Sequence, residues 1–99
     1  MPSLLKIAHG SRTLDSGTEW PIDVWISFDG PRYPLALGEG VGHASVGCSM
    51  PAVVLLDPQY ADVVAACDLG WLVDAIRRLK DSGETITAEQ LEACWRARQ

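Results

Sequence analysis

The chain has 99 residues, a length that predicts one domain spanning residues 1–99 around a single hydrophobic core. Hydrophobic residues make up 47 % of it and charged residues 21 %, which are globular values and exclude intrinsic disorder. No apolar run approaches the length of a membrane span or a signal peptide. We therefore expect no membrane partner. Three cysteines cannot all pair within one chain, and this count indicates a cytoplasmic protein in a reducing compartment.

The net charge of −5 is unevenly distributed along the sequence. Residues 15–68 hold eight acidic residues and one basic residue, Arg32, whereas the acids and bases of residues 71–99 cancel. One interpretation is an acidic surface for a basic protein, such as one that normally binds nucleic acid. The alternative is a charge that only limits self-association.

The N-terminal third predicts strands. Residues 4–9 are short and mostly apolar, which indicates a first strand. Residues 22–37 predict a β-hairpin, because apolar and polar residues alternate on both sides of the sequence Asp-Gly-Pro at 29–31. Two turns fit this pattern. A four-residue loop, 29–32, pairs Phe28 with Tyr33, Ile26 with Leu35 and Val24 with Leu37. A two-residue Asp-Gly turn also keeps the apolar residues on one face, although Pro31 could not donate the hydrogen bond that closes it.

Two further elements of the sheet follow from proline and from apolar runs. Pro34 falls at a non-hydrogen-bonded pair and cannot donate a hydrogen bond to a further strand, so we expect strand 33–37 at a sheet edge. The glycine-dense segment 38–49 predicts a loop or an irregular strand. Residues 52–56 form a continuous apolar run, which suits an interior strand.

The C-terminal half predicts helices. Asp57 is a candidate N-cap with proline at the first helical position, and apolar residues keep helical spacing from residue 60 to about residue 80. Gly70 is a point where this helix bends or breaks, with Asp68 as a cap for a second helix. Ser82-Gly83 ends this helical region. Thr87 and Gln90 form a capping box that opens a last helix.

These elements predict an α+β fold. We expect a small antiparallel or mixed sheet, which includes the hairpin 22–37, covered by two or three C-terminal helices.

Three regions carry candidate chemistry. The loop 38–49 has the glycine spacing of a phosphate-binding loop, but Cys48 stands where that loop needs lysine, and His43 replaces the first glycine of a nucleophile elbow. A thiol-dependent enzyme or ligand-binding domain using Cys48 and His43 is therefore one alternative. Cys67 and Cys94 lie on apolar helical faces and indicate core positions. No metal-ligand spacing is present, so no cofactor or metal is predicted.

A second alternative is nucleic-acid binding by the C-terminal helices. They carry five basic residues, but the acidic residues between them cancel this charge, and basic residues late in a helix suit its dipole. The basic residues are Arg77, Arg78, Lys80, Arg96 and Arg98.

The preferred hypothesis is a non-enzymatic, protein-binding module: an accessory protein, adaptor or stoichiometric inhibitor with a protein partner of basic charge. The alternation of the hairpin places Trp25 on the face opposite the core, beside acidic residues, where it either anchors a partner or is covered by another element. The candidate contact residues are Trp25, Asp23, Asp29 and Glu19. A homodimer through the exposed edge strand is a further possibility.

Overall fold

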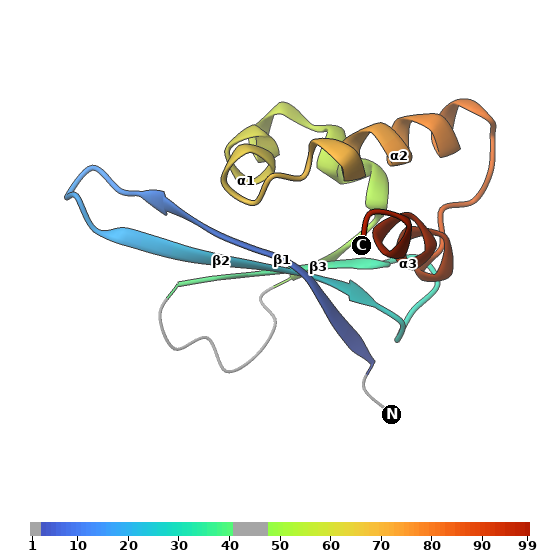
Figure 1. Cartoon of the computed structure of the whole chain (residues 1–99), viewed down its shortest axis with the longest axis horizontal. Helices are drawn as coiled ribbons and strands as arrows, with labels where there is room; N and C mark the ends of the chain where they lie inside the picture. The colour runs from blue at the N-terminus through green and yellow to red at the C-terminus, as the bar shows by residue number, and fades with distance from the viewer. Residues whose placement is uncertain (1–2, 41–47) are drawn as a thin grey trace.

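The structure, a computed structural model, describes residues 3–40 and 48–99. It has the α+β fold that the sequence predicts: an antiparallel sheet of four strands in the order β1-β2-β3-β4, followed by helices that lie on one of its faces (Figure 1). None of the helices in the described ranges is long and apolar enough to cross a bilayer. The elements are β1 (Leu4–Thr13), β2 (Glu19–Ser27), β3 (Leu35–Glu39), β4 (Cys48–Met50), the 3-10 helices η1 (Ala52–Leu56) and η2 (Pro58–Tyr60), and the α-helices α1 (Ala61–Ala66), α2 (Gly70–Asp81) and α3 (Ala88–Ala97).

The register predicted with the four-residue loop is confirmed at two of its three pairs, whereas Phe28 and Tyr33 lie beyond the ladder. Ile26 pairs with Leu35 and Val24 pairs with Leu37, so the apolar residues of β2 and β3 lie on the face that the helices cover. Ile22, Val24 and Ile26 are fully buried there, in the same core cluster as Leu91 of α3. The alternation therefore specified the core face of the sheet correctly.

The prediction that strand 33–37 lies at a sheet edge is wrong. β3 lies between β2 and β4, and its pairing with β4 begins at Leu35 and Met50. Pro34 precedes this ladder, and its carbonyl accepts a hydrogen bond of 2.8 Å from the backbone N–H of Ser27. Pro34 and Ser27 therefore form a hydrogen-bonded pair rather than the predicted non-hydrogen-bonded pair, so the missing N–H of Pro34 faces β2 and does not prevent pairing with β4. The edges of the sheet are β1 and β4.

The predicted strand at 52–56 is also wrong, because these residues form the 3-10 helix η1. Ala52 and Leu55, three residues apart, are buried, while Val53 is exposed. The backbone N–H of Val54 bonds to the Pro51 carbonyl at 3.2 Å, which closes the first turn. A short apolar run does not distinguish a strand from a buried helical segment, and here the burial repeats every three residues.

Both ends of the glycine-dense segment are strand. Gly38 lies within β3, and Cys48 and Ser49 lie within β4, so the two described ends of the segment pair in the sheet. His43 and the residues 41–47 lie outside the described residues.

The helical region breaks near the predicted point. α1 ends at Ala66 and α2 begins at Gly70, and Asp68 between them adopts a positive φ of 54°. Leu69, with no side-chain cap, precedes α2, so Asp68 does not cap it. The later boundaries follow the prediction: Gly83 has a φ of 77° after α2, and Thr87 and Gln90 form the capping box of α3.

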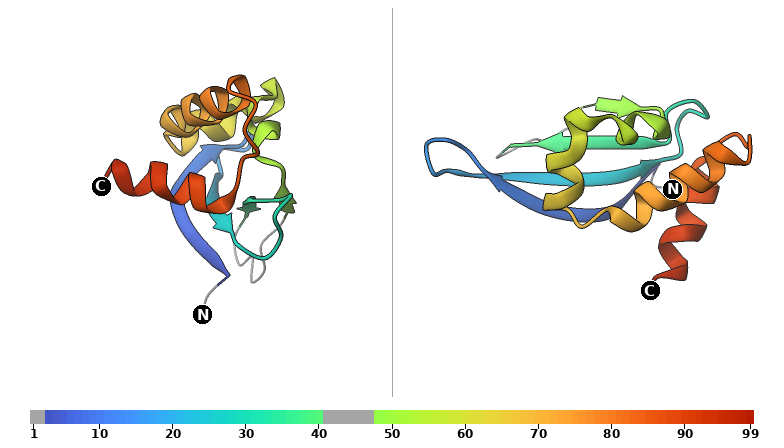
Figure 2. Two further views of the ribbon diagram at one scale, coloured as in Figure 1. Left: turned by 90° about the vertical axis from the view of Figure 1, so that its right-hand side faces the viewer. Right: turned by 90° about the horizontal axis from the view of Figure 1, so that it is seen from above.

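α1 lies directly against β1. A Cβ atom placed on Gly10 would lie 2.1 Å from the carbonyl oxygen of Ala66, so only glycine allows this approach. Beyond this contact the β1–β2 hairpin projects past α1, as Figures 1 and 2 show. The predicted strand 4–9 thus extends to Thr13, because β1 continues along the exposed arm of the hairpin.

Candidate functional site

The face of the sheet opposite the helices carries Trp25, as the alternation predicts. Lys6 of β1 and Ala36 of β3 are its cross-strand neighbours, and Ser49 of β4 continues the row beyond Ala36. Trp25 is half-buried and Ala36 is fully buried. Of the described helices, none lies on this face (Figure 1). We call the face that holds Trp25 and Asp23 the open face.

Asp23 is a buried carboxylate on the open face. Its Oδ1 lies 2.6 Å from Nδ1 of His9 and 3.7 Å from Nζ of Lys6. The Asp23 side chain is 10 % exposed, whereas that of His9 is 64 % exposed. A buried acid is stabilised by such partners, so Asp23 orients the imidazole and the ammonium group and offers little free negative charge to a partner.

Sequence reasoning missed the roles of Lys6 and His9. Lys6 pairs with Trp25 across β1 and β2, and His9 pairs with Asp23, with a register shift between Lys6 and Ala8. The sequence analysis placed both residues within the predicted strand 4–9 but assigned them no role. The pairing partner of that strand, and the shift that realigns it, depend on tertiary structure.

The other two candidate acids lie apart from each other. Glu19 is the first residue of β2 and is exposed, and Asp29 is exposed two residues beyond the end of that strand. At the rise of an extended strand, they are about 30 Å apart. The structure therefore brings Trp25 and Asp23 together and places Glu19 and Asp29 at opposite ends of the strand.

Exposed large apolar side chains gather at the β2–β3 loop. Phe28 is 37 % exposed and Tyr33 is 49 % exposed, although the alternation had placed both on the core face. Val53 of η1 is 42 % exposed. β2 ends at Ser27 and β3 begins at Leu35, so Phe28 and Tyr33 lie beyond the ends of the ladder.

Hollows in the surface surround the same loop. One, of about 370 Å³, contains Pro31 and Val53; a second contains Gly30 and Tyr33; a third contains Pro31 and Phe28. Each exposed apolar side chain thus lines a hollow that also reaches residue 30 or 31. We call Phe28, Tyr33, Val53 and these hollows the loop-end surface.

The cysteines differ in burial. Cys67 is buried, and burial, followed by the charges of Asp23 and Glu39, raises the pKa of its thiol to about 11. Its predicted core position is confirmed, while Cys94 is half-buried. A thiol with a raised pKa is a poor nucleophile. His43 lies outside the described residues, so the proposed pairing of Cys48 with His43 stays a prediction.

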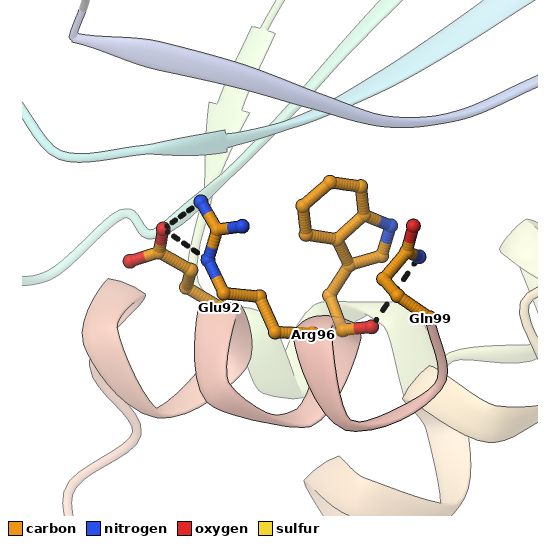
Figure 3. Close-up of polar contacts among 4 residues, drawn as sticks. Glu92, Arg96 and Gln99 are labelled. Carbon is orange, nitrogen blue, oxygen red and sulfur yellow. Dashed lines mark hydrogen bonds and ion pairs between the residues drawn. The ribbon is translucent and has the colours of Figure 1, made fainter.

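The C-terminal basic residues are partly engaged within the chain. Arg96 bonds to Glu92 through Nε at 3.1 Å and Nη2 at 2.9 Å, and Gln99 reaches back to a main-chain carbonyl of the same helix (Figure 3). The Arg98 guanidinium carbon lies 4.9 Å from the ring centroid of Trp71. In the described part of the chain, no three His, Cys, Asp or Glu side chains are placed to hold a metal ion.

Comparisons with protein families, with curated proteins and with solved structures found no match for this chain.

Proposed function

We propose that the protein is a small protein-binding module whose principal contact surface is the loop-end surface. The observation that carries the proposal is that Phe28, Tyr33 and Val53, the large apolar side chains exposed among the described residues, all lie around one loop. Single exposed apolar residues are common, but several that line hollows around one loop are typical of protein interfaces. The protein would act by stoichiometric contact, in the cytoplasm.

The polar residues around the loop-end surface carry both signs of charge. Asp29 and Arg32 are exposed within the β2–β3 loop, and Lys80 and Glu84 line the hollow beside Val53. Such a rim surrounds an apolar centre in many protein interfaces. The partner is therefore expected to present an apolar group to the loop, and its basic charge is a weaker requirement.

The open face is a second contact surface for the same function. Trp25 is a large amphipathic side chain beside the Asp23–His9 pair, and tryptophan is enriched among the residues that dominate binding energies. Binding there would place Trp25, Lys6 and His9 against the partner. One experiment separates the two surfaces.

The experiment is affinity capture from a lysate of the source organism, with quantitative mass spectrometry and four baits besides the wild type. Tyr33→Asp and Val53→Asp change the loop-end surface, Trp25→Ala changes the open face, and Ala65→Asp places the same charge on an exposed position of α1. Thermal melting by circular dichroism establishes that each bait is folded.

A partner held by wild type and Ala65→Asp, and lost from Tyr33→Asp and Val53→Asp, is the expected result. A partner lost only from folded Trp25→Ala would move the contact to the open face. Retention by all variants, or no specific partner, would refute the binding proposal. Light scattering on the purified protein tests the homodimer, which would now use the edge of β1 or β4.

A further inference from the structure

A groove lined by seven residues lies between α2 and α3. It has a volume of about 420 Å³. Three of its lining residues are large, namely Trp71 and Arg78 of α2 and Arg98 at the end of α3, and we call them the rim. The other four have side chains no larger than cysteine, so another chain element can approach the two helices closely, and we call them the floor. They are Ala75, which is buried, Cys94, which is half-buried, and Ala93 and Ala97, which are exposed.

The two arginines of this rim form no ion pair with the described residues. Among the ion pairs of the described residues, Arg12 bonds to Glu39 and Arg96 to Glu92, but Arg78 and Arg98 take part in none. Arg98 instead lies over the ring of Trp71. By contrast, the Arg96 guanidinium on α3 is held by Glu92 one turn earlier (Figure 3). Two guanidinium groups therefore remain available to carboxylates of a ligand.

We infer that this groove binds an acidic amphipathic helix of a partner protein. Such a helix would place its apolar stripe on the alanine floor and against Trp71, with Glu or Asp side chains facing Arg78 and Arg98. Recognition of an amphipathic helix by an apolar groove between helices is an established mode of peptide binding. The site is separate from the loop-end surface, so the inference does not depend on the proposed function.

The composition of the helices favours a protein ligand over nucleic acid. α2 and α3 together hold four basic residues and four acidic ones, so they present no basic stripe for a phosphate backbone. The apolar floor would gain nothing from a phosphate chain but would bury the apolar side of a helix. Asp74 is exposed on α2 and would repel an acidic ligand, so removing its charge tests whether charge governs binding.

The test uses two capped peptides of about 18 residues, long enough to form a helix. One contains Leu and Ala at helical spacing with Glu on the other face, and the second has Lys in place of Glu. Binding to the full chain is measured by fluorescence titration and by amide chemical shifts in NMR spectra.

The Glu peptide is expected to bind and to shift the amides of residues 71–78 and 93–98. Arg78→Ala and Arg98→Lys probe the rim, because the first removes a charge and the second keeps it but loses the planar group. Arg78→Ala should weaken binding by about three- to tenfold, and Arg98→Lys by about threefold, in the range of interfacial charge pairs.

Matched variants separate the groove from general charge. Arg77→Ala removes the same charge from α2 outside the groove and should change affinity by less than about twofold, and Asp74→Asn should strengthen binding. Equal losses for Arg77→Ala and Arg78→Ala, equal binding of the Lys peptide, or no binding of the Glu peptide would overturn the inference. Displacement of the Glu peptide by a single-stranded oligonucleotide would also overturn it, in favour of a nucleic-acid ligand.

Discussion

The contact between Gly10 and α1 gives the sharpest stability prediction. An added Cβ at position 10 would lie 2.1 Å from the Ala66 carbonyl oxygen and 3.1 Å from the Cys67 nitrogen, both backbone atoms. No side-chain rotation relieves this overlap, because neither partner atom belongs to a side chain. Gly10→Ala therefore requires β1 or α1 to move by at least about 1.3 Å, because an ordinary contact begins at 3.4 Å.

Such a movement separates the end of α1 from the sheet and opens gaps among the buried side chains around it. Overpacking a core costs about 1–3 kcal/mol, and a backbone overlap belongs at the upper end of that range. We expect Gly10→Ala to lower the free energy of unfolding by about 3 kcal/mol, or the melting temperature by about 15 °C in a domain of this size. Because small domains are stable by only about 5–15 kcal/mol, this loss is readily measured.

Urea unfolding followed by circular dichroism measures the change, with Gly70→Ala as the matched control. A Cβ on Gly70 meets nothing within 4 Å, and Gly70 is the first residue of α2. Alanine there should leave stability unchanged or raise it by about 0.5 kcal/mol. A loss of less than about 1 kcal/mol for Gly10→Ala would mean that α1 does not lie against β1 as described.

Three further predictions concern the cysteines and the capping box. In a Cys48→Ser background, a thiol reagent should modify Cys94 in the folded protein and Cys67 only on unfolding, because Cys67 is buried and its pKa is raised to about 11; equal rates would contradict its burial. Between the ordinary pKa of 9.0 and the folded value of about 11, the unfolded chain has lost the Cys67 proton and the folded chain retains it. The free energy of unfolding should therefore fall by about 2–3 kcal/mol as the pH rises through this interval, and a Cys67→Ala variant, less stable at pH 7, should lack that fall. Thr87→Ala should lower the free energy of unfolding by about 1 kcal/mol in urea titrations, whereas Thr85→Ala, at an exposed position before the helix, should lower it little. Similar losses for the two variants would contradict the capping role of Thr87.

Local signals in the sequence predicted the parts of the fold that depend on local chemistry. The pairing of Ile26 with Leu35 follows from the alternation on both sides of one turn. The start of α3 at Thr87 follows from a side chain and backbone within three residues. By contrast, the run 52–56 contains only apolar residues, so it has no periodicity that separates a strand from a helix, and tertiary packing decided it.

The candidate surfaces show the same division. The face of Trp25 followed from its position between Val24 and Ile26, but the burial of Asp23 by Lys6 and His9 required the pairing of β1 with β2. Phe28 and Tyr33 continue the apolar alternation and are nevertheless exposed. Their exposure depends on where the strands and the covering helices end, which no residue pattern within the hairpin specifies.

The uneven charge of the sequence has a different meaning in the folded protein. The acidic residues of segment 15–68 include Asp23 and Glu39, and β1 brings Lys6 to within 3.7 Å of Asp23 and Arg12 to within 3.0 Å of Glu39. A basic partner would have to displace these cations, and for Asp23 it would also have to reach a nearly buried carboxylate. Exposed ion pairs contribute only about 0–1 kcal/mol, so charge alone would give such a partner little affinity. Burial of apolar side chains contributes more for each residue, which is why the cluster around the β2–β3 loop, rather than the acidic composition, carries the binding proposal.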